Sequence, residues 1–420
     1  MSELIDYKNG QFHIENCDVE SLIERFSSPL YVYSKGQILK NWREFQQYWP
    51  APHKLCYAVK ANSNLAILQL LAEHGAGFDI VSGGELQRVL MAGGKADDVV
   101  FSGVAKSKDE IIMALEAGIG CFNVESEAEL ERIQDIAAAM DKQAPVSLRV
   151  NPDVDAKTHP YIATGMKANK FGISMSLAKP VFLKAHSLPN INLIGADCHI
   201  GSQIMTAEPF LDAAQRMFNL VSELEKDGIQ LTHLDLGGGF GVAYQPEEPL
   251  DKSFYLKELV KLAENYPQIT MVLEPGRAIT ADAGVLLTTV EYIKPSDDKN
   301  FVLVDAGMND LLRPSLYQAW HDILPAHENK RGGDQLNDIV GPVCETGDFF
   351  GHARHLNVQQ GDVLAIKHAG AYGFTMASNY NSRGRPPEVL VSGDNATLIR
   401  ERESFNDLVR GEHLLHQEGK

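Results

Sequence analysis

The chain has 420 residues, of which 44% are hydrophobic, so it can form two or three domains with sizeable cores. Its 38 basic and 56 acidic residues give a formal net charge of −18 at pH 7. This charge argues against nucleic acid or an anionic membrane surface as the main partner. The sequence shows no signal-peptide pattern and no apolar run near the roughly 20 residues that span a membrane. We therefore expect a cytoplasmic protein.

The five cysteines are scattered and show no C-x-x-C spacing. This pattern fits a reduced protein and predicts no metal site. Cys344 precedes a polar segment and is expected in a loop. The other four have apolar or strand-like surroundings and are expected in the core: Cys17, Cys56, Cys121 and Cys198.

From Leu55 onward, short apolar runs alternate with helical patterns. Asn64 is a favourable N-cap for the first of these helices, and the pattern after Thr206 ends at Gly228. Strand followed by helix, eight times over about 220 residues, predicts an α/β fold with a (β/α)8 TIM-type barrel; an open doubly wound sheet is the alternative. The expected strands are Leu55–Val59, Gly77–Val81, Val99–Ser102, Gly120–Val124, Val146–Val150, Leu193–Cys198, Leu231–Leu236 and Thr270–Glu274.

Beyond about residue 280 the pattern changes to short strands separated by proline and glycine turns. We expect a barrel over 36–280 and a second, mostly β domain over 281–420. Residues 1–35, with a strand at Leu30–Tyr33, are expected to join the β domain. Its other expected strands are Val285–Tyr292, Phe301–Val304, Asp338–Val343, Asp362–Lys367 and Val389–Val391.

Lys60 follows the first expected strand, at the end where barrel enzymes place their chemistry. An amine at that position can form a Schiff base with a carbonyl compound. The alternative is an ordinary lysine that extends from a strand end into water.

A run of glycines, Gly237–Gly241, follows the seventh expected strand. Consecutive backbone N–H groups can hold a phosphate there, and Gly276 with the backbone of Arg277 could complete the cradle. A tight turn without a ligand would also explain the glycines. A Schiff-base lysine together with a phosphate site suggests pyridoxal 5′-phosphate.

Glu274, at the end of the eighth expected strand, can accept a hydrogen bond from the ring nitrogen of that cofactor and keep the ring protonated. It could instead pair structurally with Arg277 or another cation. His199, after the sixth expected strand, could stack on the ring or could be an ordinary core histidine.

Four segments together resemble the alanine-racemase-like (fold type III) decarboxylases that use pyridoxal phosphate: Tyr57–Asn62, His199–Gln203, Gly237–Gly241 and Glu274–Arg277. The likeness runs from about Pro29 to Ser382. It also includes His159–Gly165, Asn169–Ile173, Arg313–Tyr317, Cys344–Asp348 and Gly370–Gly373. The motifs look most like those of members that convert meso-2,6-diaminopimelate to L-lysine and carbon dioxide, the last step of lysine biosynthesis.

The resemblance implies a role for each matching residue. Lys60 would hold the cofactor covalently, Glu274 would pair with its ring nitrogen, and His199 would stack on the ring. Cys344 would protonate the carbanion left when carbon dioxide departs. The phosphate would be held by Ser202, Gly238, Gly239, Gly276, the backbone of Arg277 and the hydroxyl of Tyr372. The substrate would be bound by Arg277, Arg313, Tyr317, Glu345 and Tyr372. In the family, the residues at the Cys344 and Glu345 positions reach the pocket from a partner subunit, which implies a head-to-tail homodimer with shared active sites.

Three alternatives remain. The substrate could be another basic amino acid: ornithine, lysine, arginine or carboxynorspermidine. Members that act on ornithine resemble Cys-Asp where this chain has Cys344-Glu345, and a pair of arginines, Arg277 and Arg313, suits a diacid. A racemase of this type prefers arginine at the position of Glu274. A non-catalytic binding protein is disfavoured because Lys60, Glu274 and Cys344 are all present.

The polar loop from Lys157 to Lys170 could be a lid or a surface connection.

Overall fold

The computed structural model describes residues 4–155 and 170–415. The chain divides into two compact units, Ile38–Ala281 and Met1–Gln37 with Asp282–Lys420. The expected motif His159–Gly165 lies outside the described residues, as does the expected loop up to Asn169.

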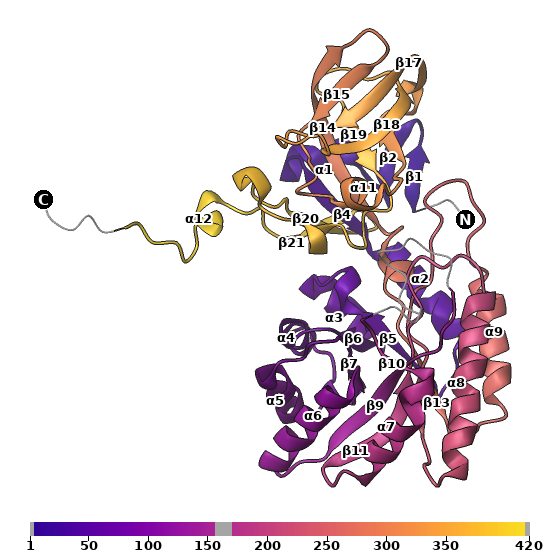
Figure 1. The fold of residues 1–420 in the computed structure, drawn as a ribbon. Coiled ribbons are helices and arrows are strands. Elements are labelled where there is room, and N and C mark those ends of the chain that lie inside the picture. Colours follow the sequence, from indigo (N-terminus) through magenta and orange to yellow (C-terminus); the bar gives the residue numbers. More distant parts are fainter. Residues whose placement is uncertain (1–3, 156–169, 416–420) are drawn as a thin grey trace, which may run out of the picture. The chain divides into compact units, whose positions relative to one another are not determined.

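In the described part of Ile38–Ala281, eight parallel strands close into a barrel (Figure 1). They are β5 (Lys54–Ala58), β6 (Gly77–Ile80), β7 (Val99–Phe101), β8 (Cys121–Val124), β9 (Ala144–Asn151), β11 (Ile191–Asp197), β12 (His233–Asp235) and β13 (Thr270–Leu273). Strand β5 pairs with β6 and β13, and the pairing of β8 with β9 completes the ring. Short β10 (Ile173–Ser174) adds to β9. The closed ring confirms the predicted barrel and excludes the open doubly wound sheet.

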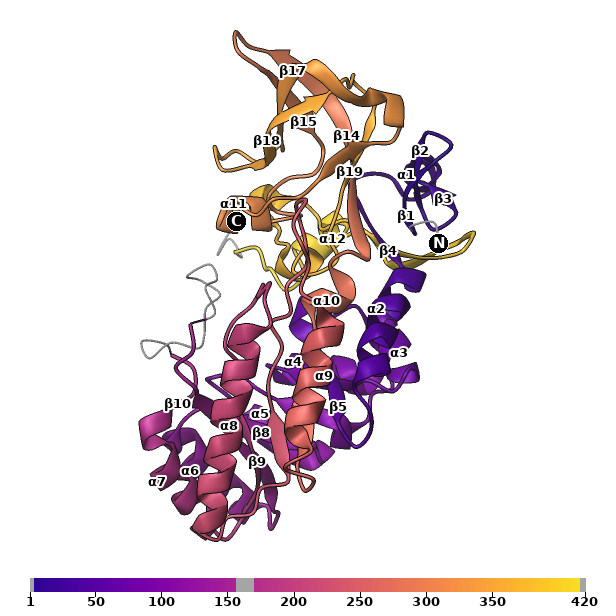
Figure 2. The ribbon, with the colours of Figure 1, turned by 90° about the vertical axis from the view of Figure 1, so that its right-hand side faces the viewer.

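Helices follow the barrel strands in sequence, and α8 and α9 lie side by side on the outside of the ring (Figures 1 and 2). The helices of this unit are α2 (Lys35–Tyr48), α3 (Leu65–Glu73), α4 (Gly83–Met91), α5 (Lys108–Ala117), α6 (Glu127–Ala139), α7 (Met175–Ser187), α8 (Glu208–Lys226), α9 (Lys252–Ala263) and α10 (Arg277–Thr280). As predicted, the Asn64 side chain caps α3 by accepting a hydrogen bond from the N–H of Ala66. The inward face of α8 is apolar, with Phe210, Met217 and Leu224 buried.

The expected boundaries of the barrel strands differ from the observed ones by at most two residues. Strand β5 ends at Ala58, and a short 3-10 helix, Val59–Ala61, follows it, so Lys60 lies just past the strand. Strand β12 is shorter than the expected Leu231–Leu236 because only His233–Asp235 keep ladder pairing with both neighbours.

The second unit is built on mixed sheets, in which most neighbouring strands are antiparallel and two pairs are parallel. Its strands are β1 (Ile5–Lys8), β2 (Gln11–Ile14), β3 (Cys17–Asp18), β4 (Leu30–Ser34), β14 (Gly284–Pro295), β15 (Asn300–Val304), β16 (Ile323–Pro325), β17 (Arg331–Val340), β18 (Phe349–Leu356), β19 (Val363–Ile366), β20 (Glu388–Ser392) and β21 (Asn395–Arg400). Its helices are α1 (Val19–Phe26), α11 (Arg313–Tyr317) and α12 (Phe405–Leu408). Strand β4 pairs with β14 and β20, so the N-terminal segment is part of this sheet.

The core of this unit comes from distant parts of the chain. Phe12, Val32 and Leu287 are fully buried in one cluster, which includes residues from β2, β4, β14, β19 and β20. Among residues 4–155 and 170–415, no helix combines the length and apolar character needed to cross a bilayer.

Several strands of this unit differ from those predicted from the sequence. The expected strand Asp338–Val343 overlaps only the last three residues of a longer one, β17, which runs from Arg331 to Val340. Its partner β18 was not expected. The β17–β18 ladder contains several register shifts, and such bulges break the alternation of apolar and polar residues on which the prediction relied.

Candidate active site

Lys60 lies at the carboxyl-terminal end of the barrel, directly after β5. Its ammonium forms an ion pair with the carboxylate of Asp79 in β6. The Lys60 side chain is 34% exposed, whereas that of Asp79 is fully buried. Because Ala58 and Asp79 are partners in the β5–β6 ladder, the pair links two neighbouring strand ends. The amine therefore lies at the boundary between the barrel interior and solvent.

Glu274 follows β13, the other neighbour of β5, and is buried. Among the described residues, its Oε1 atom has no hydrogen-bond partner. Burial, with the nearby carboxylates of Asp235 and Asp79, raises the pKa of Glu274 well above its usual value, while Lys60 acts in the opposite direction. A buried carboxylate with an unused acceptor atom is suited to a ligand with a cationic N–H group.

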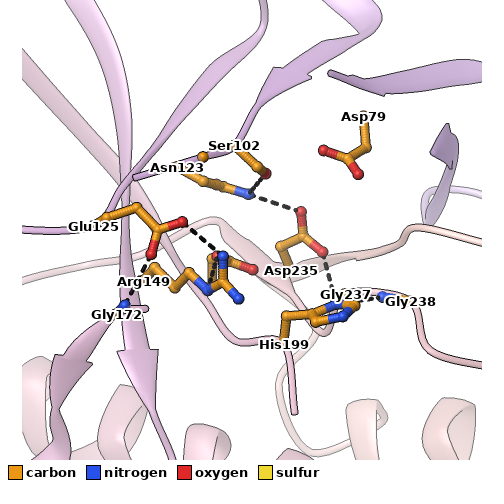
Figure 3. A network of polar contacts seen from close by, with 12 residues as sticks. Asp79, Ser102, Asn123, Glu125, Arg149, Gly172, His199, Asp235, Gly237 and Gly238 are labelled. Carbon is orange, nitrogen blue, oxygen red and sulfur yellow. Dashed lines mark hydrogen bonds and ion pairs between the residues drawn. The ribbon is translucent and has the colours of Figure 1, made fainter. Parts of the chain in front are cut away.

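Asp235 connects the barrel interior to the glycine loop (Figure 3). Its Oδ1 accepts a hydrogen bond of 2.9 Å from the N–H of Gly237. Its Oδ2 accepts one of 3.3 Å from Asn123, whose amide also lies 3.2 Å from the Ser102 hydroxyl. Burial is the main reason that the pKa of Asp235 rises to about 6. Asp235 thereby fixes the backbone at the start of the loop.

Arg149 is a buried cation in the same interior (Figure 3). Its Nη1 lies 2.6 Å from Oε1 of Glu125, and its Nε lies 3.7 Å from Oδ2 of Asp197. The second oxygen of Glu125 accepts a hydrogen bond of 2.8 Å from the N–H of Gly172. The pair of acids balances the arginine charge, as a buried cation requires.

The glycine loop leaves no room for side chains. A Cβ atom on Gly238 would lie 2.1 Å from the carbonyl oxygen of Glu274, and one on Gly239 would lie 2.2 Å from that of Gly201. Gly239 also has a φ of +100°, which side chains disfavour. A Cβ on Gly276 would lie 2.9 Å from the Cβ of Ala58. The backbones of these strand ends therefore approach closely, as in a cradle for an anion.

His199 lies against this loop. Its Nδ1 atom accepts a hydrogen bond of 3.2 Å from the N–H of Gly238, so the proton of the neutral ring is on Nε2. Burial, followed by the positive charges of Arg149 and Lys60, lowers the pKa of His199 well below its usual value. The ring is therefore neutral at pH 7 and presents a flat, uncharged face.

Ser202 and Arg277 lie together beside the glycine loop. The guanidinium of Arg277 donates to the Ser202 hydroxyl at 3.0 Å and to the Tyr244 hydroxyl at 2.9 Å. Sequence reasoning missed Tyr244, because nothing in its local segment marks it as functional. The hydroxyls of Tyr244 and Ser202 thus orient the buried guanidinium of Arg277 at the end of the barrel.

The remaining predicted residues belong to the β unit. Arg313 is buried at the start of α11, with its Nη1 2.9 Å from Nε2 of His321, and Tyr317 ends the same helix. Cys344 and Glu345 are exposed in the loop that follows β17. Tyr372 is partly exposed and has a φ of 55°. The exposure of Cys344 and the burial of the other four cysteines agree with the sequence prediction.

Sequence reasoning overlooked the polar residues inside the barrel strands, such as Asp79, Asp235 and Arg149. The signal was present, since each is a charged residue within an otherwise apolar strand. Charged residues are almost never buried without a partner or a function. Their partners lie on other strands and are visible only in the fold.

One end of the barrel therefore combines an amine, a buried carboxylate with an unused acceptor atom, and a glycine cradle. These groups fit pyridoxal phosphate, which offers an aldehyde to the amine, a basic ring nitrogen to the carboxylate and a phosphate to the cradle. The class that this fold and site define is a pyridoxal-phosphate enzyme built on a (β/α)8 barrel.

Comparison with known proteins narrows this class. Residues 35–281 match the family model described as pyridoxal-dependent decarboxylase, pyridoxal binding domain. The chain is 52% identical to a diaminopimelate decarboxylase of Haemophilus influenzae over 403 residues, which are 96% of this chain and 97% of that protein. This chain belongs to the diaminopimelate decarboxylase family of pyridoxal-dependent decarboxylases.

Solved structures agree. A diaminopimelate decarboxylase from M. jannaschii in complex with L-lysine superposes with a TM-score of 0.93 at 39% identity, covering 98% of both chains. One from Helicobacter pylori, also with L-lysine, gives a TM-score of 0.90 at 42% identity and covers 94% of this chain and 98% of the other. The likeness thus extends over both units of the fold.

Proposed function

We propose that this chain removes carbon dioxide from meso-2,6-diaminopimelate to give L-lysine, with pyridoxal 5′-phosphate as cofactor, in the last step of lysine biosynthesis. The observation that carries the proposal is the unused Oε1 atom of buried Glu274, at the barrel end that also holds the Lys60–Asp79 ion pair. In a member of this family, a buried acid with an unused acceptor atom is explained by a cofactor whose ring nitrogen donates a hydrogen bond to that acid.

The cofactor, when bound, supplies an electron sink for the charge left on the substrate α-carbon. Lys60 supplies the amine that holds it. Glu274 keeps the ring nitrogen protonated, because a carboxylate close to a cationic N–H favours the charged form. His199, neutral and fixed by its bond to Gly238, stacks on the ring without adding a charge.

The glycine cradle would hold the phosphate. Backbone N–H groups there, including that of Arg277, would bind it without competing side chains. The residues assigned to the phosphate are Ser202, Gly238, Gly239, Gly276, Arg277 and Tyr372. Tyr372 would add a hydroxyl from the β unit.

The substrate carries a second carboxylate and a second ammonium at its far end, and these groups need charged partners. Arg313 presents a planar guanidinium that can bind a carboxylate through two hydrogen bonds, a geometry that a lysine cannot provide. Glu345 would bind the distal ammonium. The residues assigned to the substrate are Arg277, Arg313, Tyr317, Glu345 and Tyr372.

Cys344 is assigned as the acid that returns a proton to the α-carbon after carbon dioxide leaves. It is exposed in the isolated chain, an unusual state for a cysteine and one that suits a residue that completes a neighbouring site. We propose a head-to-tail homodimer in which Cys344 and Glu345 serve the partner's barrel. The scattered cysteines, which show no C-x-x-C spacing, favour a cytoplasmic location.

The test is release of carbon dioxide by the purified holoenzyme with meso-diaminopimelate, ornithine, lysine and arginine as separate substrates. We expect turnover with meso-diaminopimelate and little with the others, because they lack the distal carboxylate that Arg313 would bind. Equal or faster turnover of ornithine would overturn the substrate assignment while leaving the cofactor assignment intact.

A further inference from the structure

The segment from Ser378 to Arg383 is fixed to the body of the β unit at both ends. The N–H of Ser378 donates to the carbonyl of Asn309 at 2.8 Å. Nη2 of Arg383 donates to the carbonyl of Asp305 at 2.6 Å. Between these anchors, Tyr380–Ser382 forms a short turn that is kinked at Asn381. The segment can therefore hold another loop in place.

The loop that it holds contains Cys344. The N–H of Cys344 donates a hydrogen bond of 2.8 Å to Oδ1 of Asn381, thirty-seven positions further along the chain. Its neighbour Glu345 bonds within the loop instead, to the carbonyl of Val343 at 2.8 Å. The side chain of Asn381 is thus a contact from outside the loop to the backbone of Cys344 itself.

Asn381 has an unusual backbone conformation. Its φ of 55° and ψ of 29° lie in the left-handed region. Asparagine tolerates this region better than most residues with a side chain, and its amide provides a hydrogen-bond acceptor close to the backbone. The next residue, Ser382, is also left-handed, with a φ of 54°, so it offers a matched control position.

We propose that Asn381 is a positioning residue that fixes the backbone of Cys344. The inference rests on the proposed function, in which Cys344 is the proton donor and Glu345 binds the distal ammonium. A cysteine thiol is one rotatable bond from its backbone, so the orientation of that backbone decides where the sulfur points. An error of about 1 Å in the position of a reacting group can slow a reaction by about 100-fold.

The experiment compares Asn381→Gly, Asn381→Asp and Ser382→Gly in the holoenzyme. Asn381→Gly removes the acceptor and keeps a residue at ease with positive φ. We expect it to lower kcat by about 10- to 100-fold with little change in KM. Asn381→Asp keeps an oxygen at the acceptor position and should therefore keep most of the activity that Asn381→Gly loses. Ser382→Gly relaxes the same turn without touching the bond and should behave as wild type. Wild-type kcat in Asn381→Gly, or an equal loss in Ser382→Gly, would overturn the proposal.

Two further measurements separate this inference from the proposed function. If Asn381 acts only through Cys344, Asn381→Gly should add no further loss in a Cys344→Ala background; independent, additive losses would contradict the inference. Alkylation by iodoacetamide reports on Cys344, since the other four cysteines are buried. Its rate should change in Asn381→Gly and not in Ser382→Gly. Undiminished turnover in Cys344→Ala would refute the role of the thiol itself, whatever Asn381 does.

Discussion

The Lys60 ammonium and the Asp79 carboxylate form an ion pair across the ends of two neighbouring barrel strands. The pair keeps the amine at the mouth of the barrel. It also influences Glu85, at the third position of α4, whose pKa is lowered by Lys60 and raised by Asp79. The electrostatics of the site therefore extend into the first turn of a surrounding helix.

Glu85 gives the first prediction. Burial is the main cause that raises its pKa from 4.5 to about 7. The folded protein then binds a proton that the unfolded chain releases, so the stability from this group is present below pH 4.5 and is lost as the pH rises through about 7. Glu85→Gln does not titrate, so the melting temperature of the cofactor-free variant should rise relative to wild type across that interval.

Glu110→Gln provides a control of opposite sign. Backbone hydrogen bonds from Gly83 and Ser107 lower the pKa of Glu110, so its charged form stabilises the folded protein above the unfolded pKa. That variant should lose stability relative to wild type as the pH rises from acid to neutral. The same pH trend in both variants would refute the assignment for Glu85.

Glu274→Gln should separate activity from stability. The amide cannot stabilise a protonated ring nitrogen as a carboxylate does, so we expect kcat to fall on the order of 100-fold. The cofactor-free protein should become no less stable, because the substitution replaces a buried ionisable acid whose Oε1 atom has no partner among the described residues. Activity and thermal unfolding test this, with exposed Glu264→Gln as the control. A large loss of stability without loss of activity would show that the acid is structural.

Gly238→Ala should destabilise the protein and weaken cofactor binding. The added Cβ would lie 2.1 Å from a backbone oxygen that cannot move away easily. Overpacking of this kind costs about 1–3 kcal/mol. The matched control is Gly84→Ala in α4, where the added Cβ meets only the Ser82 hydroxyl at 3.8 Å and the helix gains a better helix former. Chemical denaturation and cofactor titration measure both effects, and equal behaviour of the two variants would refute the cradle.

His321→Asn should raise KM for the diacid substrate more than it lowers kcat. Nδ1 of His321 lies 2.8 Å from the Lys367 carbonyl and so carries the proton, which leaves Nε2 to accept from Arg313. The shorter asparagine side chain cannot reach both Arg313 and the Lys367 carbonyl, so the guanidinium loses this hydrogen bond. Exposed His355→Asn is the control, since the Nδ1 of His355 lies 3.0 Å from the carbonyl oxygen of Gly333 at the surface of the β unit. An unchanged KM in His321→Asn would show that this histidine does not position Arg313.

The barrel could be predicted from the sequence because its signals are local. Apolar runs, helix caps such as Asn64 and the glycines after β12 each act within a few residues. The β unit was harder, since bulged strands such as β17 have no regular alternation, and its sheet joins β4 to β14 and β20 across most of the chain.

The candidate site shows the same contrast between local sequence signals and contacts that depend on the fold. Lys60 and Glu274 could be identified because each is an unusual residue where an apolar strand ends. The partnership of Lys60 with Asp79 depends on strand pairing, and the contact between Asn381 and Cys344 depends on how two loops fold together. Neither relationship leaves a pattern in the sequence. The roles assigned to individual site residues remain predictions.

The most direct test of the account is the identity of the lysine that holds the cofactor. The holoenzyme is reduced with borohydride, digested and mapped by mass spectrometry. We predict a pyridoxyl group on the peptide that contains Lys60, and loss of both this label and lysine formation in Lys60→Ala. A label on another lysine, or full turnover in Lys60→Ala, would contradict the account.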